Sequence, residues 1–205
     1  MFKKACIATL MLSVVALSAQ AEDAGGYVAA SVGQAKAEQP KPIKEGGNVS
    51  SNRESTAFKL ILGLNSNLYM ALEAQYIDLG ESRYKGASVV PASALDIKTD
   101  LETKGWGINL VGTLPLADFG LFAKAGYHQL KTTIKVASPV PGHSRSQTAR
   151  KWSPSFAVGA KYNITTAFTV LIEYEQYMGV ADKKIDSRNM KHDIDMASLG
   201  LRYNF

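Results

Sequence analysis

The segment Met196-Ala-Ser-Leu-Gly-Leu-Arg-Tyr-Asn-Phe205, at the end of the sequence, alternates with a period of two. Its odd-numbered positions carry apolar or aromatic side chains, and most of its even-numbered positions carry small or polar ones. Because successive side chains of a β-strand point to opposite faces, the segment predicts a strand with one apolar and one polar face. A strand of a soluble β-sandwich and a strand of a transmembrane barrel both fit this pattern.

Seven further segments alternate in the same way, so the chain has eight candidate strands. They cover residues 26–35, 55–65, 68–78, about 98–114, 119–132, 151–163, 167–178 and, at the C-terminus, from about 191 onward. Four residues break the pattern, because Ile61, Val111 and Leu171 lie in the polar set and Gly112 lies in the apolar set. One such segment is weak evidence, but eight in series indicate an all-β chain.

Charged side chains indicate which face of these strands meets lipid. In the alternating segments, seven of them fall in the set of positions that also holds the small and polar residues, here called the polar parity: Lys59, Glu73, Lys124, Lys161, Glu173, Glu175 and Arg202. A Lys or Arg that faces lipid near the bilayer midplane costs about 2–4 kcal/mol. We therefore predict that these seven residues form a charge network inside a closed barrel. The rival fold is a β-sandwich, in which the charged faces meet water and the aliphatic faces share one core.

The connections between the candidate strands alternate in length. Residues 65–67, 115–118 and 163–166 are short turn signals, whereas residues 36–54, 80–97, 133–150 and 179–190 are long and polar. Short turns at one end, long loops at the other and both termini on the short-turn side are the layout of an outer-membrane barrel. Basic residues in the loop 133–150 are candidates to contact anionic sugars and phosphates of the outer leaflet, with a solvated face as the alternative.

Residues 1–21 have the pattern of a secretory signal peptide. The basic pair Lys3-Lys4 precedes an apolar run over residues 6–17, and Ala19-Gln-Ala21 is a small-x-small cleavage site. The run is too short for a membrane helix, which needs about 20 apolar residues. We expect residues 22–205 to form one exported domain. Cys6, the only cysteine, is then lost with the signal, so we expect no disulfide.

Four stretches carry a resemblance to a known family. They are Tyr27-Val-Ala-Ala-Ser-Val-Gly33, Tyr76-Ile-Asp-Leu-Gly80, Ser153-Pro-Ser-Phe-Ala-Val-Gly-Ala-Lys-Tyr-Asn-Ile-Thr165 followed by Glu173-Tyr174, and Ser198-Leu-Gly-Leu-Arg-Tyr-Asn-Phe205. On these residues the chain resembles the transmembrane domain of OmpA and the wider OmpA-like and OmpX-like small barrels. The resemblance covers essentially the whole mature chain. It implies an eight-stranded antiparallel transmembrane β-barrel, an up-and-down meander, in the bacterial outer membrane.

The resemblance also implies partners. They are the membrane lipids, lipopolysaccharide and the barrel-assembly machinery, which reads the terminal aromatic strand in this family. The corresponding assembly signal here is Leu201, Tyr203 and Phe205. OmpA carries a periplasmic peptidoglycan-binding domain after its barrel, and we expect no such domain after Phe205.

The interior charges depart from the OmpA pattern. In OmpA an interior carboxylate–cation cluster is proposed to gate a narrow water path, and Glu73 matches its first carboxylate. Lys161, Leu171 and, roughly, Val111 stand where the family has a second carboxylate, an arginine and a lysine. The same gate is therefore not implied, and a rewired Glu73–Lys161 pair is our hypothesis.

The interior of an eight-stranded barrel is just wide enough for side chains to fill, which argues against a general diffusion porin. Our first hypothesis is a non-enzymatic, monomeric outer-membrane protein that supports envelope integrity and presents extracellular loops. The alternative is a narrow channel or carrier for small or hydrophobic solutes. A lipid-modifying enzyme is a third class. His143 and Ser144 are neighbours along a loop, which does not make a nucleophile–base pair. We expect no catalytic residue, cofactor, metal or nucleic-acid partner.

Overall fold

The computed structural model describes residues 25–37, 50–52, 54–87, 96–137, 145–180, 184–185, 188–189 and 192–205. The predicted signal peptide, its cleavage site and the predicted start of the mature domain lie outside these residues. Within the described ranges, no helix has the length and apolar character needed to cross a membrane.

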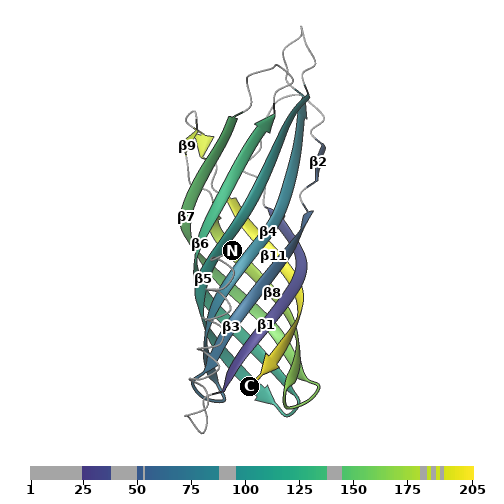
Figure 1. Ribbon diagram of the computed structural model, residues 1–205, viewed down its shortest axis with the longest axis vertical. Helices are drawn as coiled ribbons and strands as arrows, with labels where there is room; N and C mark the ends of the chain where they lie inside the picture. The colour runs from purple at the N-terminus through teal and green to yellow at the C-terminus, as the bar shows by residue number, and fades with distance from the viewer. Residues whose placement is uncertain are drawn as a thin grey trace, which may run out of the picture.

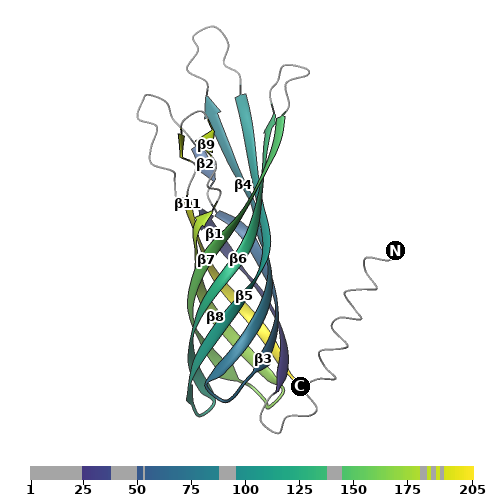
Figure 2. The same ribbon diagram turned by 90° about the vertical axis from the view of Figure 1, so that its left-hand side faces the viewer.

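Eight long antiparallel strands close into a barrel, as Figures 1 and 2 show. They are β1 (Gly26–Ala37), β3 (Glu54–Asn65), β4 (Met70–Ala87), β5 (Asp96–Leu116), β6 (Phe119–Ala137), β7 (Arg145–Asn163), β8 (Phe168–Val180) and β11 (His192–Asn204). Each long strand pairs with the next one along the chain, and β11 pairs with β1. The short strand β2 (Ser50–Asn52) lies along β4, and β9 (Lys184–Ile185) pairs with β10 (Arg188–Asn189). The predicted all-β, eight-stranded meander is confirmed, and the sandwich is excluded.

The barrel closes where the two ends of the described chain meet. The β1–β11 register runs from Tyr27 opposite Asn204 to Ala37 opposite Ile194. Beyond it, the Gly26 amide donates to the Phe205 carbonyl at 3.2 Å, and the Phe205 amide donates to the Gly26 carbonyl at 2.9 Å. Both ends therefore lie at the short-turn end, as predicted.

Two of the three short turns are fixed by a side chain that accepts backbone hydrogen bonds. Asn67 Oδ1 accepts from the amides of Tyr69 and Met70 at 2.9 and 2.8 Å. Thr165 Oγ1 accepts from the amides of Ala167 and Phe168 at 3.2 and 3.0 Å in the same way. These polar side chains replace the missing ladder partners, which is why turn-forming residues stand at these positions.

The strands β4 to β7 continue well past the predicted loop boundaries. Residues 80–87, 96–97, 133–137 and 145–150 are strand, so the prediction that 80–97 and 133–150 are loops is wrong for them. These residues are polar and lack a sustained period of two, and backbone hydrogen-bonded ladders do not require that alternation. We call residues 81–87, 96–103, 132–137 and 145–151 the outer extension, and Figure 2 shows it projecting beyond the barrel.

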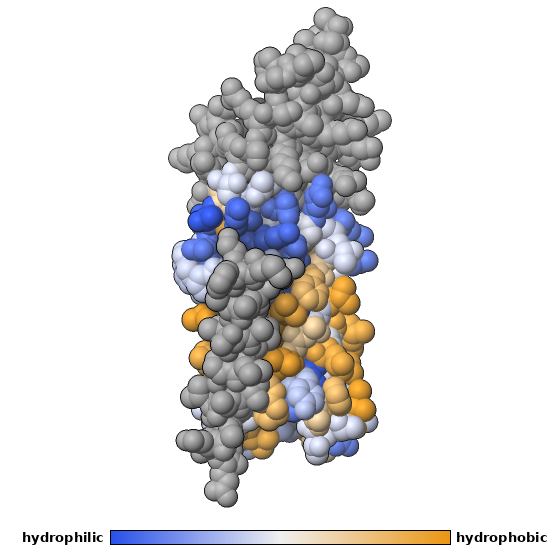
Figure 3. Space-filling view, in the orientation of Figure 1, coloured by the Kyte–Doolittle hydropathy of each residue, from blue (hydrophilic) through white to orange (hydrophobic). Residues whose placement is uncertain are grey.

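The outer surface carries an apolar band, which Figure 3 shows below a hydrophilic belt. Aromatic side chains mark both edges of this band. The upper girdle consists of Tyr76, Trp106, Tyr127 and Trp152, and the lower girdle consists of Tyr69, Phe119, Tyr162, Phe168 and Tyr203. Seven to ten residue steps along a tilted strand separate the girdles, which is roughly 18–25 Å and comparable with the apolar band of outer-membrane barrels.

Three aromatic rings inside the barrel lie on inward-facing glycines of the neighbouring strand. Tyr27 lies against Gly63, His128 against Gly107 and Phe122 against Gly159. Each ring and its glycine are direct cross-strand partners. A methyl group at any of these glycines would overlap the ring, so the missing side chain is what lets a large ring fit in a narrow lumen.

We predict that Gly63→Ala destabilises the barrel by roughly 1–3 kcal/mol, the usual cost of overpacking. The new methyl group would push the Tyr27 ring off the β3 backbone. The matched control is Gly112→Ala on the outer face, where an added methyl group meets nothing within 4 Å. The free energy of unfolding, measured by urea titration in phospholipid vesicles, should fall for the first variant only. Equal effects of the two variants would contradict this account of Gly63.

Candidate functional site in the barrel lumen

The structure places all seven charged residues that the sequence singled out on the inner face of the barrel. Lys59, Glu73, Lys124, Glu173 and Glu175 are buried near its middle. Lys161 and Arg202 lie nearer the short-turn end and are partly exposed. Whether these residues have a functional role beyond folding stays a prediction.

Five of the seven form one ion-pair network, made of Lys59, Glu73, Lys124, Glu173 and Glu175. Lys59 contacts Glu173, and its Nζ lies 3.0 Å from Glu175 Oε2. Lys124 Nζ lies 2.8 Å from Glu73 Oε2 and 2.7 Å from Glu173 Oε2. Glu173 therefore joins both lysines, and each ion pair links two strands that are not neighbours in the sheet, β3 with β8, β4 with β6 or β6 with β8, across the lumen.

Neutral side chains satisfy the remaining polar atoms of Glu175. Gln75 Nε2 donates to Glu175 Oε2 at 3.2 Å and to Tyr177 Oη at 2.8 Å. Asn109 Nδ2 in turn donates to Gln75 Oε1 at 2.9 Å. Such additional hydrogen bonds are what make buried charges tolerable, since a buried carboxylate needs partners for more than one lone pair.

Tyr27 connects the network to Arg202. Its hydroxyl donates to Glu73 Oε1 at 2.7 Å, and the Arg202 guanidinium lies 3.5 Å from the centroid of its ring. The Tyr27 ring thus packs against Gly63 and makes a cation–π contact with Arg202.

The hypothesis of a Glu73–Lys161 pair is wrong. Glu73 pairs with Lys124 and Tyr27 instead. Lys161 is the cross-strand partner of Leu171, which is two residues closer to the short-turn end than Glu173. Among the described residues, no ion pair joins Lys161 to a carboxylate. The inner-face parity of Lys161 was readable from sequence, but its height relative to Glu73 across the lumen depends on the strand register.

Apolar side chains lie in the lumen on both sides of the network. The upper apolar layer, toward the long connections, consists of Ala35, Ala37, Ala57, Ile77, Leu79, Leu130, Tyr177, Val180, Ile194 and Met196. The lower apolar layer, toward the short turns, consists of Tyr27, Ala29, Ile61, Ala71, Val111, Phe122 and Leu171. The charged side chains therefore lie between the upper and lower apolar layers rather than in an open polar channel.

The middle of the lumen is closed to water. The exposed fractions of Lys59, Glu175 and His128 are all 0%. A continuous water path past these side chains would leave part of their surface accessible. The ion-pair network and the two apolar layers together fill the barrel, as expected for eight strands.

One histidine–serine contact lies next to this network and was not predicted. His128 Nδ1 and Ser155 Oγ are 3.1 Å apart, and the His128 ring packs edge-on against Tyr177. Both residues are buried in the closed lumen, so a substrate from solvent or lipid has no access to the hydroxyl. His143 lies outside the described residues.

The outer membrane protein beta-barrel domain family matches residues 7–205. The chain belongs to this family. Among solved structures, it is similar to Neisserial surface protein A, with 17% identity, a TM-score of 0.54, and coverage of 90% of this chain and 100% of that one. It is also similar to OprG from Pseudomonas aeruginosa, with 13% identity, a TM-score of 0.58, and coverage of 91% and 98%. Ail of Yersinia pestis is 19% identical, with a TM-score of 0.50 and coverage of 88% and 99%.

These structures share the barrel fold at low identity, and the resemblance to small outer-membrane barrels is confirmed. Comparison with curated proteins gives no significant match. The roles of individual residues in this member of the family therefore rest on its own geometry.

Several lumen residues that take part in these contacts were not predicted from the sequence. They are Tyr27, Gln75, Asn109, His128, Ser155 and Tyr177. Each of them lies on the same inner parity as the charges, so the signal was present. Only the register could show that their side chains contact the network.

We predict that Lys59→Met destabilises the barrel by about 3–5 kcal/mol, the cost of leaving a buried carboxylate unpaired. Adding Glu175→Gln should restore part of the lost stability, because it removes the stranded charge. The matched control is Lys161→Met, which removes a lumen lysine that has no ion pair among the described residues. Urea unfolding in vesicles measures all three variants. A Lys59→Met barrel as stable as the Lys161→Met barrel would contradict the network.

Proposed function

We propose that this protein is a non-enzymatic, non-conducting barrel of the bacterial outer membrane. It supports envelope integrity and presents its outer extension and loops for surface interactions. The closed lumen is the observation that carries the proposal. The side chains of the ion-pair network and of the two apolar layers fill the barrel and stabilise it. Interactions with other molecules therefore take place on its outer surface and at its ends.

The alternative, a narrow channel or carrier for small or hydrophobic solutes, is less well supported. A solute would have to displace both apolar layers and separate Lys59 from two carboxylates. Separating buried, paired charges is costly in a low-dielectric interior. The hydrophobic girdles and the closed lumen support a role as a membrane anchor instead.

Contact with lipopolysaccharide is part of the proposal and is supported by a basic row above the upper girdle. Lys104, Lys131 and Arg150 are direct cross-strand neighbours on the outer face. Lys104 is paired with Asp78 at 3.2 Å and Glu102 at 2.6 Å. Lys131 and Arg150 have like charges side by side, which is unfavourable until an anion joins them. Phosphates of the outer leaflet lie at this height and would supply it.

The outer extension supports surface presentation. It continues four paired strands above the basic row. Among the described residues, β7 pairs with β8 only from Ser155 onward, so residues 145–154 have a strand partner on one side only. Exposed strand edges are sites where other proteins add a strand, and the basic residues of β7 limit indiscriminate pairing.

Assembly by the outer-membrane machinery is proposed through Leu201, Tyr203 and Phe205. Leu201 and Tyr203 are exposed on the lipid-facing side of β11, the strand that closes the barrel against β1, and Phe205 follows directly after this strand. The Phe205 ring packs over Gly26, so this recognition signal is also the last part of the closing seam.

Planar-bilayer recording tests the proposal. The folded protein, inserted with a gel-mobility shift as proof of folding, should add no stepwise conductance above the bare bilayer. A general porin inserted under the same conditions is the positive control. Stepwise conductance that appears with this protein and is lost on its heat denaturation would contradict a closed lumen and favour the channel.

The envelope role has its own readout in cells. Loss of the protein should raise the uptake of a hydrophobic dye through the outer membrane, and the intact protein supplied from a plasmid should reverse it. Unchanged dye uptake, with the protein abundant in the parent strain, would remove envelope support from the proposal.

A further inference from the structure

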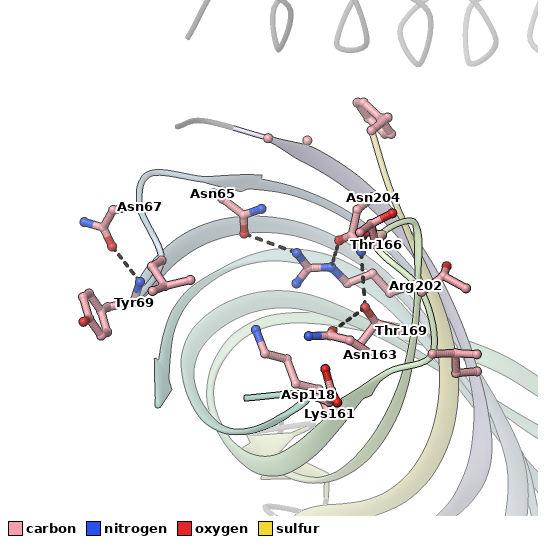
Figure 4. Close-up of a pocket in the computed structure, with 16 residues that line it drawn as sticks. Asn65, Asn67, Tyr69, Asp118, Lys161, Asn163, Thr166, Thr169, Arg202 and Asn204 are labelled. Atoms are coloured by element: carbon pink, nitrogen blue, oxygen red, sulfur yellow. Dashed lines mark hydrogen bonds between the residues drawn. The ribbon is translucent and has the colours of Figure 1, made fainter. Parts of the chain in front are cut away.

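The short-turn end of the barrel holds an open pocket of about 760 Å³, which lies below the lower apolar layer. Figure 4 shows its polar lining, drawn from several strands and all three short turns. This end faces the periplasm, because the long connections of outer-membrane barrels are extracellular. The pocket does not take part in the ion-pair network, and the proposed function does not use it.

Two cations, on the strands β7 and β11 that flank β8, share this pocket. The Lys161 ammonium and the Arg202 guanidinium turn toward the same space in Figure 4. Asp118 also lines the pocket, but no ion pair joins it to either cation within the described part of the chain. Two cations and one carboxylate therefore line the pocket, which leaves a net positive charge in a concave wall and focuses the field on whatever enters.

Arg202 is held in place by its neighbours. Its Nε donates to Asn204 Oδ1 at 2.5 Å, its Nη2 donates to Asn65 Oδ1 at 3.4 Å, and its guanidinium plane rests on Tyr27. A guanidinium has five N–H donors, so several remain for a ligand. A fixed, planar donor group of this kind suits an oxyanion.

Lys161 is held by a glycine on the next strand. A Cβ at Gly120 would lie 2.7 Å from Lys161 Cε and 3.1 Å from its Cγ, so the bare backbone of Gly120 makes room for the lysine stem. The ammonium at its tip then has no acceptor in an ion pair. Two neighbouring cations that are held in place repel each other, and an anion bound between them would relieve this repulsion.

Neutral groups complete the lining. Thr169 Oγ1 donates to Asn163 Oδ1 at 2.9 Å and accepts from Asn204 Nδ2 at 3.2 Å, which orders this wall. Because Asn163 Oδ1 accepts this bond, its Nδ2 group is available to donate. The wall thus adds neutral donors to two cations.

We propose that this pocket binds a phosphate group, as free phosphate or as a small periplasmic phosphate monoester. Two cations outnumber the one carboxylate of the lining, Asp118, and the guanidinium, ammonium and amide groups supply several donors to an anion in the pocket. Tyr27, Phe122 and Leu171 close the pocket above, so the ligand binds at a dead end and is not transported through the barrel.

Backbone amide shifts of isotope-labelled protein in detergent micelles test the proposal. Phosphate, glycerol 3-phosphate and acetate are added separately at constant ionic strength. We expect saturable shifts at Asn65, Asn163 and Thr169 with phosphate, and at least tenfold weaker binding of acetate. Tighter binding of glycerol 3-phosphate than of phosphate would identify a monoester as the ligand, and the reverse order would identify free phosphate.

Two variants and one control separate the site from general electrostatics. Lys161→Met keeps the stem on Gly120 and should weaken phosphate binding at least tenfold. Gly120→Ala keeps both cations, displaces the lysine and should also weaken binding. Lys131→Met, on the outer surface, should titrate as the parent does. The proposal is overturned if phosphate gives no saturable shifts, if acetate binds equally well, or if Lys161→Met and Lys131→Met behave alike.

Discussion

A charge inside an eight-stranded barrel must be neutralised by another side chain, because the filled lumen leaves no water to do so. Glu173 is where this constraint is most visible, since it contacts both Lys59 and Lys124. Removing Lys59 leaves Glu175 without its ion-pair partner, and removing Lys124 does the same to Glu73. Removing Glu173 leaves each lysine with one carboxylate and separates the network into two ion pairs. The hydrogen bonds from Gln75 and Tyr27 follow from the same demand. Because the partners come from strands far apart in the sequence, their pairing fixes the strands relative to one another.

A steric constraint acts in the lumen beside this electrostatic one, and inward-facing glycines are what satisfy it. A lumen that holds the five side chains of the network has little room for aromatic rings. Tyr27, Phe122 and His128 fit only because a glycine stands directly opposite on the next strand. Tyr27 shows how the two constraints meet, since the ring that rests on Gly63 also hydrogen bonds to Glu73 and carries Arg202.

Much of this fold could be predicted from the sequence because a strand has a period of two. Parity alone placed Lys59 and Glu175 inside the barrel and Leu199 outside it. The breaks in the pattern were informative too, since Ile61, Val111 and Leu171 form part of the lower apolar layer. The outer extension was missed because its residues lack a sustained period of two, and backbone pairing does not require one. The choice of Lys124 over Lys161 as the partner of Glu73 could not be predicted, because contact across a barrel depends on register and tilt.

The ends of the barrel follow different rules from its middle. Above the upper girdle, basic side chains stand next to one another on the outer face. Below the lower apolar layer, Lys161 and Arg202 share an open pocket. Both lysines of the sealed middle are thus ion-paired, whereas no ion pair is found for Lys131, Arg150, Lys161 or Arg202 at the ends within the described part of the chain. The interior accounts for stability, and the ends are where binding is chemically supported.

Amine labelling of the folded barrel in phospholipid vesicles tests the closed, charge-neutralised lumen most directly. A small acylating reagent reacts with accessible lysines, and peptide mass spectrometry reports each site. We predict that Lys131 and Lys161 react while Lys59 and Lys124 stay unmodified until the protein is unfolded. Reaction of Lys59 or Lys124 in the folded barrel at a rate close to that of Lys131 would show that water reaches the network, and would contradict the account.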